Sequence, residues 1–262
     1  MNHIGLFEGI GGFSLAAKWM NWETIAWCEW NEFCQKVLSY HFPNAKKHGN
    51  IIQTDFTIYR GKCDILTGGF PCQPNSRAGK QKFQEDERHL WPEMFRAYRE
   101  IMPTWGVGEN VPGIVDNEFS IREIQSNLES IGYNVLPIKI PANIVGAGHK
   151  RERIWFIAYA SGGRQQGGKQ RVFKAHEERY DEKNLLARGI FPSEWGNGLS
   201  RPRIFRDNDG LSKRLVNITL PKWRTESIKS YGNAIVPQVA YKIFKTIELL
   251  NDGVINVQNE DK

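Results

Sequence analysis

Cysteine and long apolar segments are both scarce in this chain of 262 residues. Its four cysteines lie in the first third and form no Cys-x-x-Cys pair, which argues against a zinc site or a disulfide framework and fits a reducing compartment. No apolar run approaches membrane-spanning length, and the N-terminus has no basic stretch followed by an apolar one. We therefore expect a soluble, cytoplasmic protein with no bound metal and no membrane contact.

Positive charge is concentrated in one part of the chain. Residues 161–225 contain 14 Lys and Arg against 7 Asp and Glu, a net charge of +7, whereas the whole chain carries +6. The same segment is rich in Arg, Gly, Pro and Trp and shows little periodicity. Such a localised excess is typical of a surface that binds a polyanion, although a solvated basic loop region would have the same composition.

Apolar strands alternate with helical stretches in the first 160 residues, which predicts an α/β fold with a doubly wound sheet. Asn31 is placed to cap the second helix. A last apolar helical face, from Val236 to Leu250, is expected to pack back on the first domain. The predicted strands are 3–7, 24–29, 63–67, 105–111, 134–140 and 154–159, and the predicted helices are 13–19, 32–41, 90–101 and 121–131.

A glycine loop, Phe7-Glu-Gly-Ile-Gly-Gly, follows the first strand and opens a helix. Glycines there allow a tight turn and the close approach of a ligand to backbone amides. The second strand ends at Glu29, whose carboxylate can accept hydrogen bonds from two ribose hydroxyls, and Trp30 can stack on an adenine. Each also has a structural interpretation, Glu29 as an acid at a helix start and Trp30 as a core residue.

The candidate nucleophile is Cys72, which lies between an apolar strand and a polar, basic loop. Arg77 and Lys80 are close in sequence, and nearby positive charge favours the thiolate. Taken alone, the cysteine could be a small apolar residue in a tight turn. Glu109 ends the next predicted strand, so it should emerge at the same edge of the sheet as Cys72.

Two arginines form a further candidate element. Arg151 and Arg153 lie two residues apart at a predicted strand start, so they should point to the same side of the sheet. Such a pair can grip a phosphate or a carbonyl oxygen, or simply form an exposed basic edge.

Taken in order, these segments resemble the motifs of the DNA cytosine-C5 methyltransferases along nearly the whole chain. The resemblance implies a Rossmann-like, S-adenosylmethionine-dependent methyltransferase sheet, formed by 1–160 plus 226–262, with 161–225 as a small, irregular, basic target-recognition domain. The matching segments are Phe7–Phe13, Glu29-Trp30, Pro71-Cys72-Gln73, Glu109-Asn110-Val111, Lys150–Arg153 and Tyr231–Val239.

The resemblance also implies roles for individual residues. Cys72 would add to carbon 6 of a flipped-out cytosine, and Glu109 would hold ring nitrogen 3 and the exocyclic amine. Arg151 or Arg153 would contact the base carbonyl oxygen or orient a loop. No metal is needed for this chemistry. The residues implied for S-adenosylmethionine, and for its product S-adenosylhomocysteine, are Phe7, Gly9, Gly11, Gly12, Glu29, Trp30, Asn50, Ile51, Pro71, Asn233 and Ala234.

Double-stranded DNA is the implied partner of a monomeric enzyme, in a setting where a restriction endonuclease can accompany it. Residues 74–88 are expected to close over the flipped base. Positive charge and Arg side chains in 161–225 are expected to contact phosphates and base edges. The residues expected to contact DNA are Gln73, Ser76, Arg77, Lys80, Arg201, Arg203 and Arg206.

Several positions depart from the family pattern, and other interpretations exist. Gly5 stands where an Asp is usual, Asn50 replaces an Asp, Asn75 a Phe and His149 a Gln. A related enzyme that methylates transfer RNA is one alternative, although the Cys-Phe-Thr segment typical of that branch is absent from the sequence. The others are an inactive DNA-binding homologue, which the intact Cys72 and Glu109 disfavour, and a Rossmann dehydrogenase, which the glycine spacing disfavours.

Overall fold

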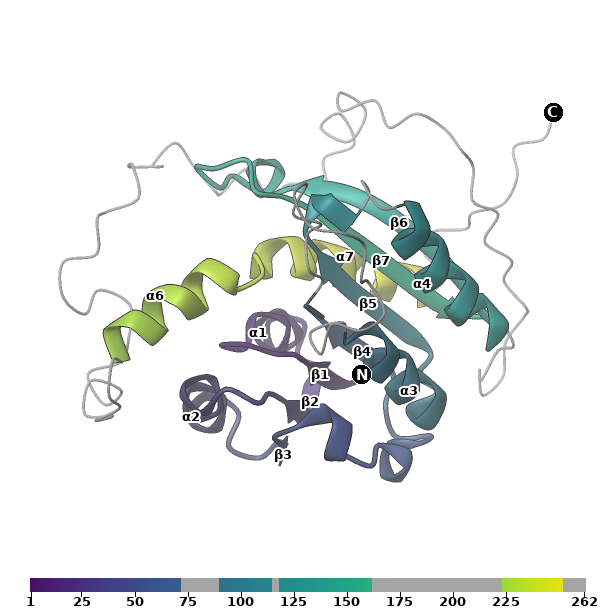
Figure 1. Ribbon diagram of the computed structural model, residues 1–262, viewed down its shortest axis with the longest axis horizontal. Coiled ribbons are helices and arrows are strands. Elements are labelled where there is room, and N and C mark those ends of the chain that lie inside the picture. Colours follow the sequence, from purple (N-terminus) through teal and green to yellow (C-terminus); the bar gives the residue numbers. More distant parts are fainter. Residues whose placement is uncertain (72–89, 115–117, 162–222, 252–262) are drawn as a thin grey trace, which may run out of the picture.

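The structure of the chain is a computed structural model that describes residues 1–71, 90–114, 118–161 and 223–251. A seven-stranded sheet forms its centre, and helices cover both of its faces (Figure 1). This layering of helix, sheet and helix confirms the predicted α/β fold.

The strand order in the sheet is β3-β2-β1-β4-β5-β7-β6. The first five strands are parallel, whereas β7 runs antiparallel to both β5 and β6. The order reverses beside β1, and open α/β sheets bind ligands at such a switch point, outside the carboxyl ends of the strands. The strands are β1 (Asn2–Leu6), β2 (Glu23–Cys28), β3 (Lys46–His48), β4 (Ile65–Gly68), β5 (Trp105–Asn110), β6 (Tyr133–Pro141) and β7 (Glu152–Ala160).

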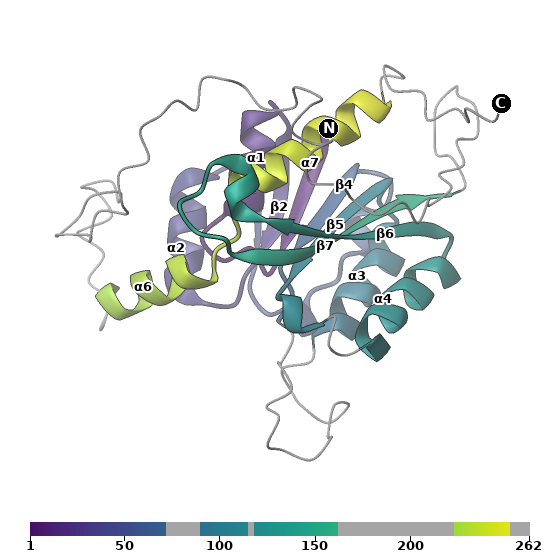
Figure 2. The same ribbon diagram turned by 90° about the horizontal axis from the view of Figure 1, so that it is seen from above.

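Figure 2 shows α1 and α7 on one face of the sheet and α3 and α4 on the other. Helix α6 leads into α7 and contacts α2. The helices are α1 (Gly12–Trp19), α2 (Glu32–His41), α3 (Trp91–Ile101), α4 (Glu118–Ser130), α6 (Trp223–Asn233) and α7 (Pro237–Asn251), with short 3-10 turns η1 (Ile51–Gln53), η2 (Thr57–Tyr59), η3 (Pro112–Ile114) and η4 (Ala142–Val145).

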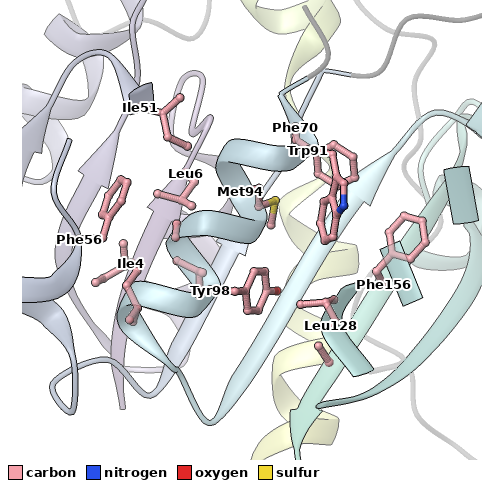
Figure 3. Close-up of a cluster of buried hydrophobic side chains, with 14 of the residues drawn as sticks. Ile4, Leu6, Ile51, Phe56, Phe70, Trp91, Met94, Tyr98, Leu128 and Phe156 are labelled. Atoms are coloured by element: carbon pink, nitrogen blue, oxygen red, sulfur yellow. The ribbon is translucent and has the colours of Figure 1, made fainter. Parts of the chain in front are cut away.

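Adjacent residues of one strand serve the two opposite cores, because successive side chains of a strand point to opposite faces. Ile65 packs with α1 and α7, whereas its neighbour Leu66 packs with α3 and α4. The strands buried on both faces therefore read as nearly continuous apolar runs in the sequence. Residues of the α3/α4 core drawn in Figure 3 include Ile4, Leu6, Ile51, Phe56, Phe70, Trp91, Met94, Tyr98, Leu128 and Phe156.

The predicted strands and helices match the observed ones, with shifted ends, and two elements were missed. Asn31 caps α2 as predicted, because its side-chain oxygen accepts the backbone N–H of Cys34 at 3.1 Å. The sequence predicts neither β3, which is short and lacks a buried residue, nor α6. Helix α6 buries Ser227 and Ser230, one turn apart, so its buried face is polar and gives no apolar periodicity.

Most of the predicted target-recognition segment, 161–225, lies outside the described residues, because 162–222 are not among them. The division of the chain into two domains therefore stays a prediction. Within the described ranges, no helix combines the length and the apolarity that a membrane crossing requires.

Two glycines of β5 form a matched pair for a packing test. A Cβ on Gly106 would overlap the ring and hydroxyl of the fully buried Tyr98, whereas a Cβ on Gly108 would lie 3.5 Å from Phe70, an ordinary contact. We expect Gly106→Ala to lower the free energy of unfolding by about 1–3 kcal/mol. Gly108→Ala should stay within about 1 kcal/mol of the parent. Urea denaturation measures both, and equal losses would contradict the packing at Gly106.

Candidate active site

The glycine loop leaves β1 at the carboxyl edge of the sheet with an unusual backbone. Phe7, Gly9 and Gly11 have φ angles of 50°, 57° and 92°. Phe7 is the unexpected member, because a residue with a bulky side chain rarely adopts positive φ and the surroundings must hold it there. The Gly11 N–H donates to the carbonyl of Glu8 at 3.0 Å, which closes the turn before α1 begins.

Glu29 follows β2 and joins the glycine loop to the start of α2. Its two carboxylate oxygens accept the backbone N–H groups of Gly9 and Asn31, each at 2.8 Å. The side chain is therefore buried and ordered beside the loop, as a ribose-binding acid would need to be. Trp30, the next residue, is 81% exposed, so the interpretation of Trp30 as a core residue is wrong.

Asn50 and Ile51 form the turn that follows β3. The side-chain oxygen of Asn50 accepts the N–H of Ile52 at 3.0 Å, while the Ile51 side chain is buried. Arg96 on α3 braces this turn, since its guanidinium donates to the carbonyls of Ile51 at 2.6 Å and Thr54 at 3.1 Å.

Sequence analysis does not identify Arg96 as part of the site. Its charge is balanced within α3 by Glu93 at 2.8 Å and Glu100 at 2.7 Å, which read as ordinary helix-surface pairs. The two contacts that matter are made to backbone oxygens about 45 residues away in sequence, and no residue pattern reports such contacts.

Glu109 lies at the carboxyl end of β5, where it forms an ion pair with Arg153 of the antiparallel strand β7. The Arg153 Nε lies 2.9 Å from the Glu109 Oε1. Burial raises the pKa of Glu109 to about 7, and the positive charges of Arg153 and Arg151 oppose that rise. A carboxyl group with a pKa near neutrality can both hold and release a proton, which suits acid–base chemistry.

The segment that precedes the predicted nucleophile passes beside Glu109. The Asn110 side chain donates to the carbonyl of Phe70 at 3.1 Å, and a Cβ on Gly69 would lie 3.7 Å from the Glu109 Oε2. The structure thus places the residues just before Cys72 next to Glu109. Cys72 itself lies outside the described residues.

Arg151 differs from the prediction, because it precedes β7 and is not part of the strand. Its φ of 32° interrupts the extended backbone, so the two-residue alternation with Arg153 does not apply. The Arg151 Nη2 donates to the carbonyls of Gly232 at 2.8 Å and Ala234 at 2.7 Å. Arg151 therefore joins the start of β7 to the last motif. The role predicted for it in the reaction stays a prediction.

The last motif reaches the glycine loop through the α6–α7 junction. Asn233 ends α6 and Ala234 follows it, and a Cβ on Gly12 would lie 2.5 Å from the Ile235 Cγ1. Only a glycine at position 12 permits this approach. A hollow of about 520 Å³ opens here between the glycine loop, the β6–β7 connection and the junction, which lie together in Figure 2. Gly11, Arg151 and Ala234 are among its lining residues.

The remaining predicted site residues lie outside the described residues. Within the described residues, no group of three or more His, Cys, Asp or Glu side chains is arranged to hold a metal ion. The predicted residues that lie outside the described ranges are Cys72, Gln73, Ser76, Arg77, Lys80, Arg201, Arg203 and Arg206, and with them the departure at Asn75.

The raised pKa of Glu109 predicts a pH-dependent stability. Between its ordinary value near 4.5 and about 7, the folded state binds more protons than the unfolded state, so stability falls as pH rises through this window. Glu109→Gln should flatten that fall, by roughly 2–3 kcal/mol across the window. Urea denaturation from pH 4.5 to 8 measures it, with Glu129→Gln as the control that removes an exposed charge. A slope unchanged by Glu109→Gln would contradict this assignment.

Comparison with known proteins places the chain in a family. The family model for C-5 cytosine-specific DNA methylase matches residues 1–197. Type II methyltransferase M.PspPI of Psychrobacter is 37% identical over 159 residues, which are 59% of this chain and 38% of that protein. M.HhaI of Haemophilus parahaemolyticus is 33% identical over 162 residues, which are 61% of this chain and 49% of that protein. The matched part thus covers less than half of each of these curated relatives.

Solved structures share the fold. A putative DNA modification methyltransferase encoded within an E. coli prophage is 28% identical, with a TM-score of 0.53 over 61% of this chain and 47% of that one. The S. pombe Dnmt2 methyltransferase is 16% identical, with a TM-score of 0.62 over 96% and 99%. The second likeness concerns the fold alone. The family model covers three quarters of the residues of this chain, and the chain therefore belongs to the C-5 cytosine-specific DNA methylase family.

Proposed function

We propose that the chain transfers a methyl group from S-adenosylmethionine to carbon 5 of a flipped-out cytosine in double-stranded DNA, through a covalent Cys72 adduct. One observation supports this most directly: the buried Glu109, paired with Arg153, lies beside the segment that leads into Cys72. The acid that this reaction requires thus lies beside the residues that precede the proposed nucleophile in the sequence, within a family of cytosine-specific DNA methylases.

The residues around the glycine loop fit the proposed cofactor. S-adenosylmethionine, when bound, supplies an electrophilic methyl group on a sulfonium. The positive-φ loop brings backbone close to a ligand, the anchored Glu29 carboxylate can accept ribose hydroxyls, and the exposed Trp30 indole offers a face for adenine. The Asn50 oxygen keeps a second lone pair for the adenine amino group.

Covalent catalysis by Cys72 addresses the low nucleophilicity of cytosine carbon 5. Addition of the thiolate to carbon 6 makes carbon 5 enamine-like and divides one hard step into easier ones. Charge then develops on the ring at nitrogen 3. Glu109, with a pKa of about 7, can hold a proton at that nitrogen at neutral pH. Once carbon 5 carries the methyl group, its proton passes to a base such as a water molecule and the Cys72 thiolate is expelled, which restores the aromatic ring.

The two arginines divide the supporting work. Arg153 pairs with the Glu109 carboxylate from its place on β7, and we assign to it the contact with the carbonyl oxygen of the base. Arg151 acts through the backbone of the last motif, holding Asn233 and Ala234 against the cofactor loop. Arg151 is therefore proposed as a positioning residue.

DNA contacts are proposed for the parts of the sequence that the structure does not describe. A base inside a stacked duplex is inaccessible, so the cytosine must be flipped out at a cost of a few kcal/mol. We assign closure over this base to residues 74–88, with Gln73, Ser76, Arg77 and Lys80 near the DNA. Base and phosphate contacts within 161–225 are assigned to Arg201, Arg203 and Arg206. We further propose that the chain acts as a monomer, alongside a restriction endonuclease.

Transfer of labelled methyl groups tests the activity and the nucleophile together. The parent chain should methylate DNA rather than transfer RNA and should form a covalent adduct on DNA that contains 5-fluorocytosine. Cys72→Ala should abolish both, with a loss of at least about 10³-fold in rate, because the covalent route disappears. Cys63→Ala, which alters a buried thiol of the core, is the matched control and should retain the adduct. Equal activity in Cys72→Ala would refute the mechanism.

Salt dependence tests the proposed loop contacts. The double variant Arg77→Ala/Lys80→Ala should weaken DNA binding and reduce the slope of log K against log salt by about 1.8, since each lost phosphate contact contributes about 0.9. The control Lys18→Ala/Lys245→Ala removes the same charge from exposed positions on α1 and α7. Fluorescence anisotropy at several salt concentrations measures the slopes. If both double variants gave the same slope, residues 74–88 would not contact phosphates.

A further inference from the structure

Glu8, inside the glycine loop, carries a buried carboxyl group that the proposed reaction does not use. Only 5% of the residue is exposed. Its Oε1 accepts the backbone N–H of Ser14 at 2.7 Å, while its Oε2 is buried and has no partner among the described residues. Burial raises the pKa of Glu8 to about 7, the hydrogen bonds from Ser14 oppose the rise, and the nearby Glu29 adds to it. Burying a carboxyl group with an unpaired oxygen costs folding free energy, so its position calls for a structural explanation.

The unpartnered oxygen points at the one residue of β1 that has no side chain. A Cβ built on Gly5 would lie 2.6 Å from the Cδ of Glu8 and would overlap its Oε2. The carboxylate of Glu8 thus occupies the space that any side chain at position 5 would need. Gly5 is also where the sequence departs from the family pattern, so this departure has a structural partner within the loop.

The same carboxylate supplies the cap that α1 lacks. Gly11 occupies the N-cap position and has no side chain to accept the first N–H groups of the helix. Glu8, three residues before the N-cap, accepts one of them, the N–H of Ser14. Two acids therefore hold the glycine loop. Glu29 accepts the N–H of Gly9, and Glu8 accepts the N–H of Ser14 in the first turn of α1.

We propose that Glu8 is a positioning residue for the cofactor loop. In this proposal Gly5 and Glu8 form an interlocked pair: the Glu8 carboxylate, which comes from the loop, fills the space that Gly5 of β1 leaves open. This inference rests on the proposed binding of S-adenosylmethionine at that loop. Because the carboxylate caps α1 and fills the space over Gly5, it fixes the positive-φ backbone of Phe7 and Gly9 that faces the ligand.

Single substitutions test each half of the pair. Glu8→Ala removes the cap and should weaken the binding of S-adenosylhomocysteine about tenfold, which corresponds to about 1.4 kcal/mol. Glu8→Gln keeps the filled space and an acceptor for Ser14, so it should restore most of the affinity. Gly5→Ala should lower the melting temperature, because its methyl group displaces the carboxylate. Gly108→Ala, which adds a methyl group in ordinary contact on β5, is the matched control and should melt close to the parent.

Double substitutions separate the interlock from simple damage. Gly5→Ala/Glu8→Ala should melt above Gly5→Ala alone, because the added methyl group enters the space that the carboxylate has left. Gly5→Asp should unfold easily, since two carboxyl groups compete for one space. In Gly5→Asp/Glu8→Ala the carboxylate arrives from the strand instead, and both melting temperature and affinity for S-adenosylhomocysteine should recover.

Calorimetric titration with S-adenosylhomocysteine and thermal unfolding without ligand give independent readings. Parent-like affinity in Glu8→Ala would overturn the positioning role, and additive losses in the double variants would overturn the interlock. Failure of the parent chain itself to bind S-adenosylhomocysteine would refute the proposed function instead. The interlock would still show in the unfolding of the ligand-free variants, so the two failures can be told apart.

Discussion

The pairing register of the parallel strands determines where everything else in the candidate site lies. Leu6 pairs with Cys28 and with Gly68, and Gly68 pairs with Gly108, so four strands reach the same level at one edge of the sheet. Whatever follows those residues must emerge together, next to the switch point. Backbone hydrogen bonding therefore sets the layout of the site, and side chains refine it. The segments that emerge there are the glycine loop, Glu29, Gly69 and Glu109.

Three acids converge on this edge, and each is held in a different way. Glu29 accepts two backbone N–H groups, Glu8 accepts one, and Glu109 pairs with a guanidinium. Burial makes an unheld carboxylate costly, so these contacts also fix the geometry of the loops that make them. Glu29 and Glu8 thus hold the backbone of the glycine loop, whereas Glu109 is held against strand β7.

The sequence predicts what depends on local pattern and misses what depends on distant pairing. Apolar runs indicate the buried strands, and Asn31 indicates the start of α2, because each signal lies within a few residues of the element that it predicts. The ion pair between Glu109 and Arg153 joins residues 44 positions apart and requires the antiparallel register of β7. The positive φ of Arg151 has no signal in the sequence, and its side-chain contacts with Gly232 and Ala234 join residues more than 80 positions apart.

The reversed direction of β7 has a topological consequence for the residues that follow it. The amino end of β7, near Arg153, lies at the site edge, so the strand ends at Ala160 at the opposite edge of the sheet. There the Ala160 N–H donates to the carbonyl of Thr104. It re-enters the described structure in α6, where Glu226 meets Asn31 back at the site edge. Strand β7 itself is nine residues long, about 30 Å, a distance that about ten extended residues can span. The sequence between Ala160 and α6 is several times longer than a direct return of that length requires.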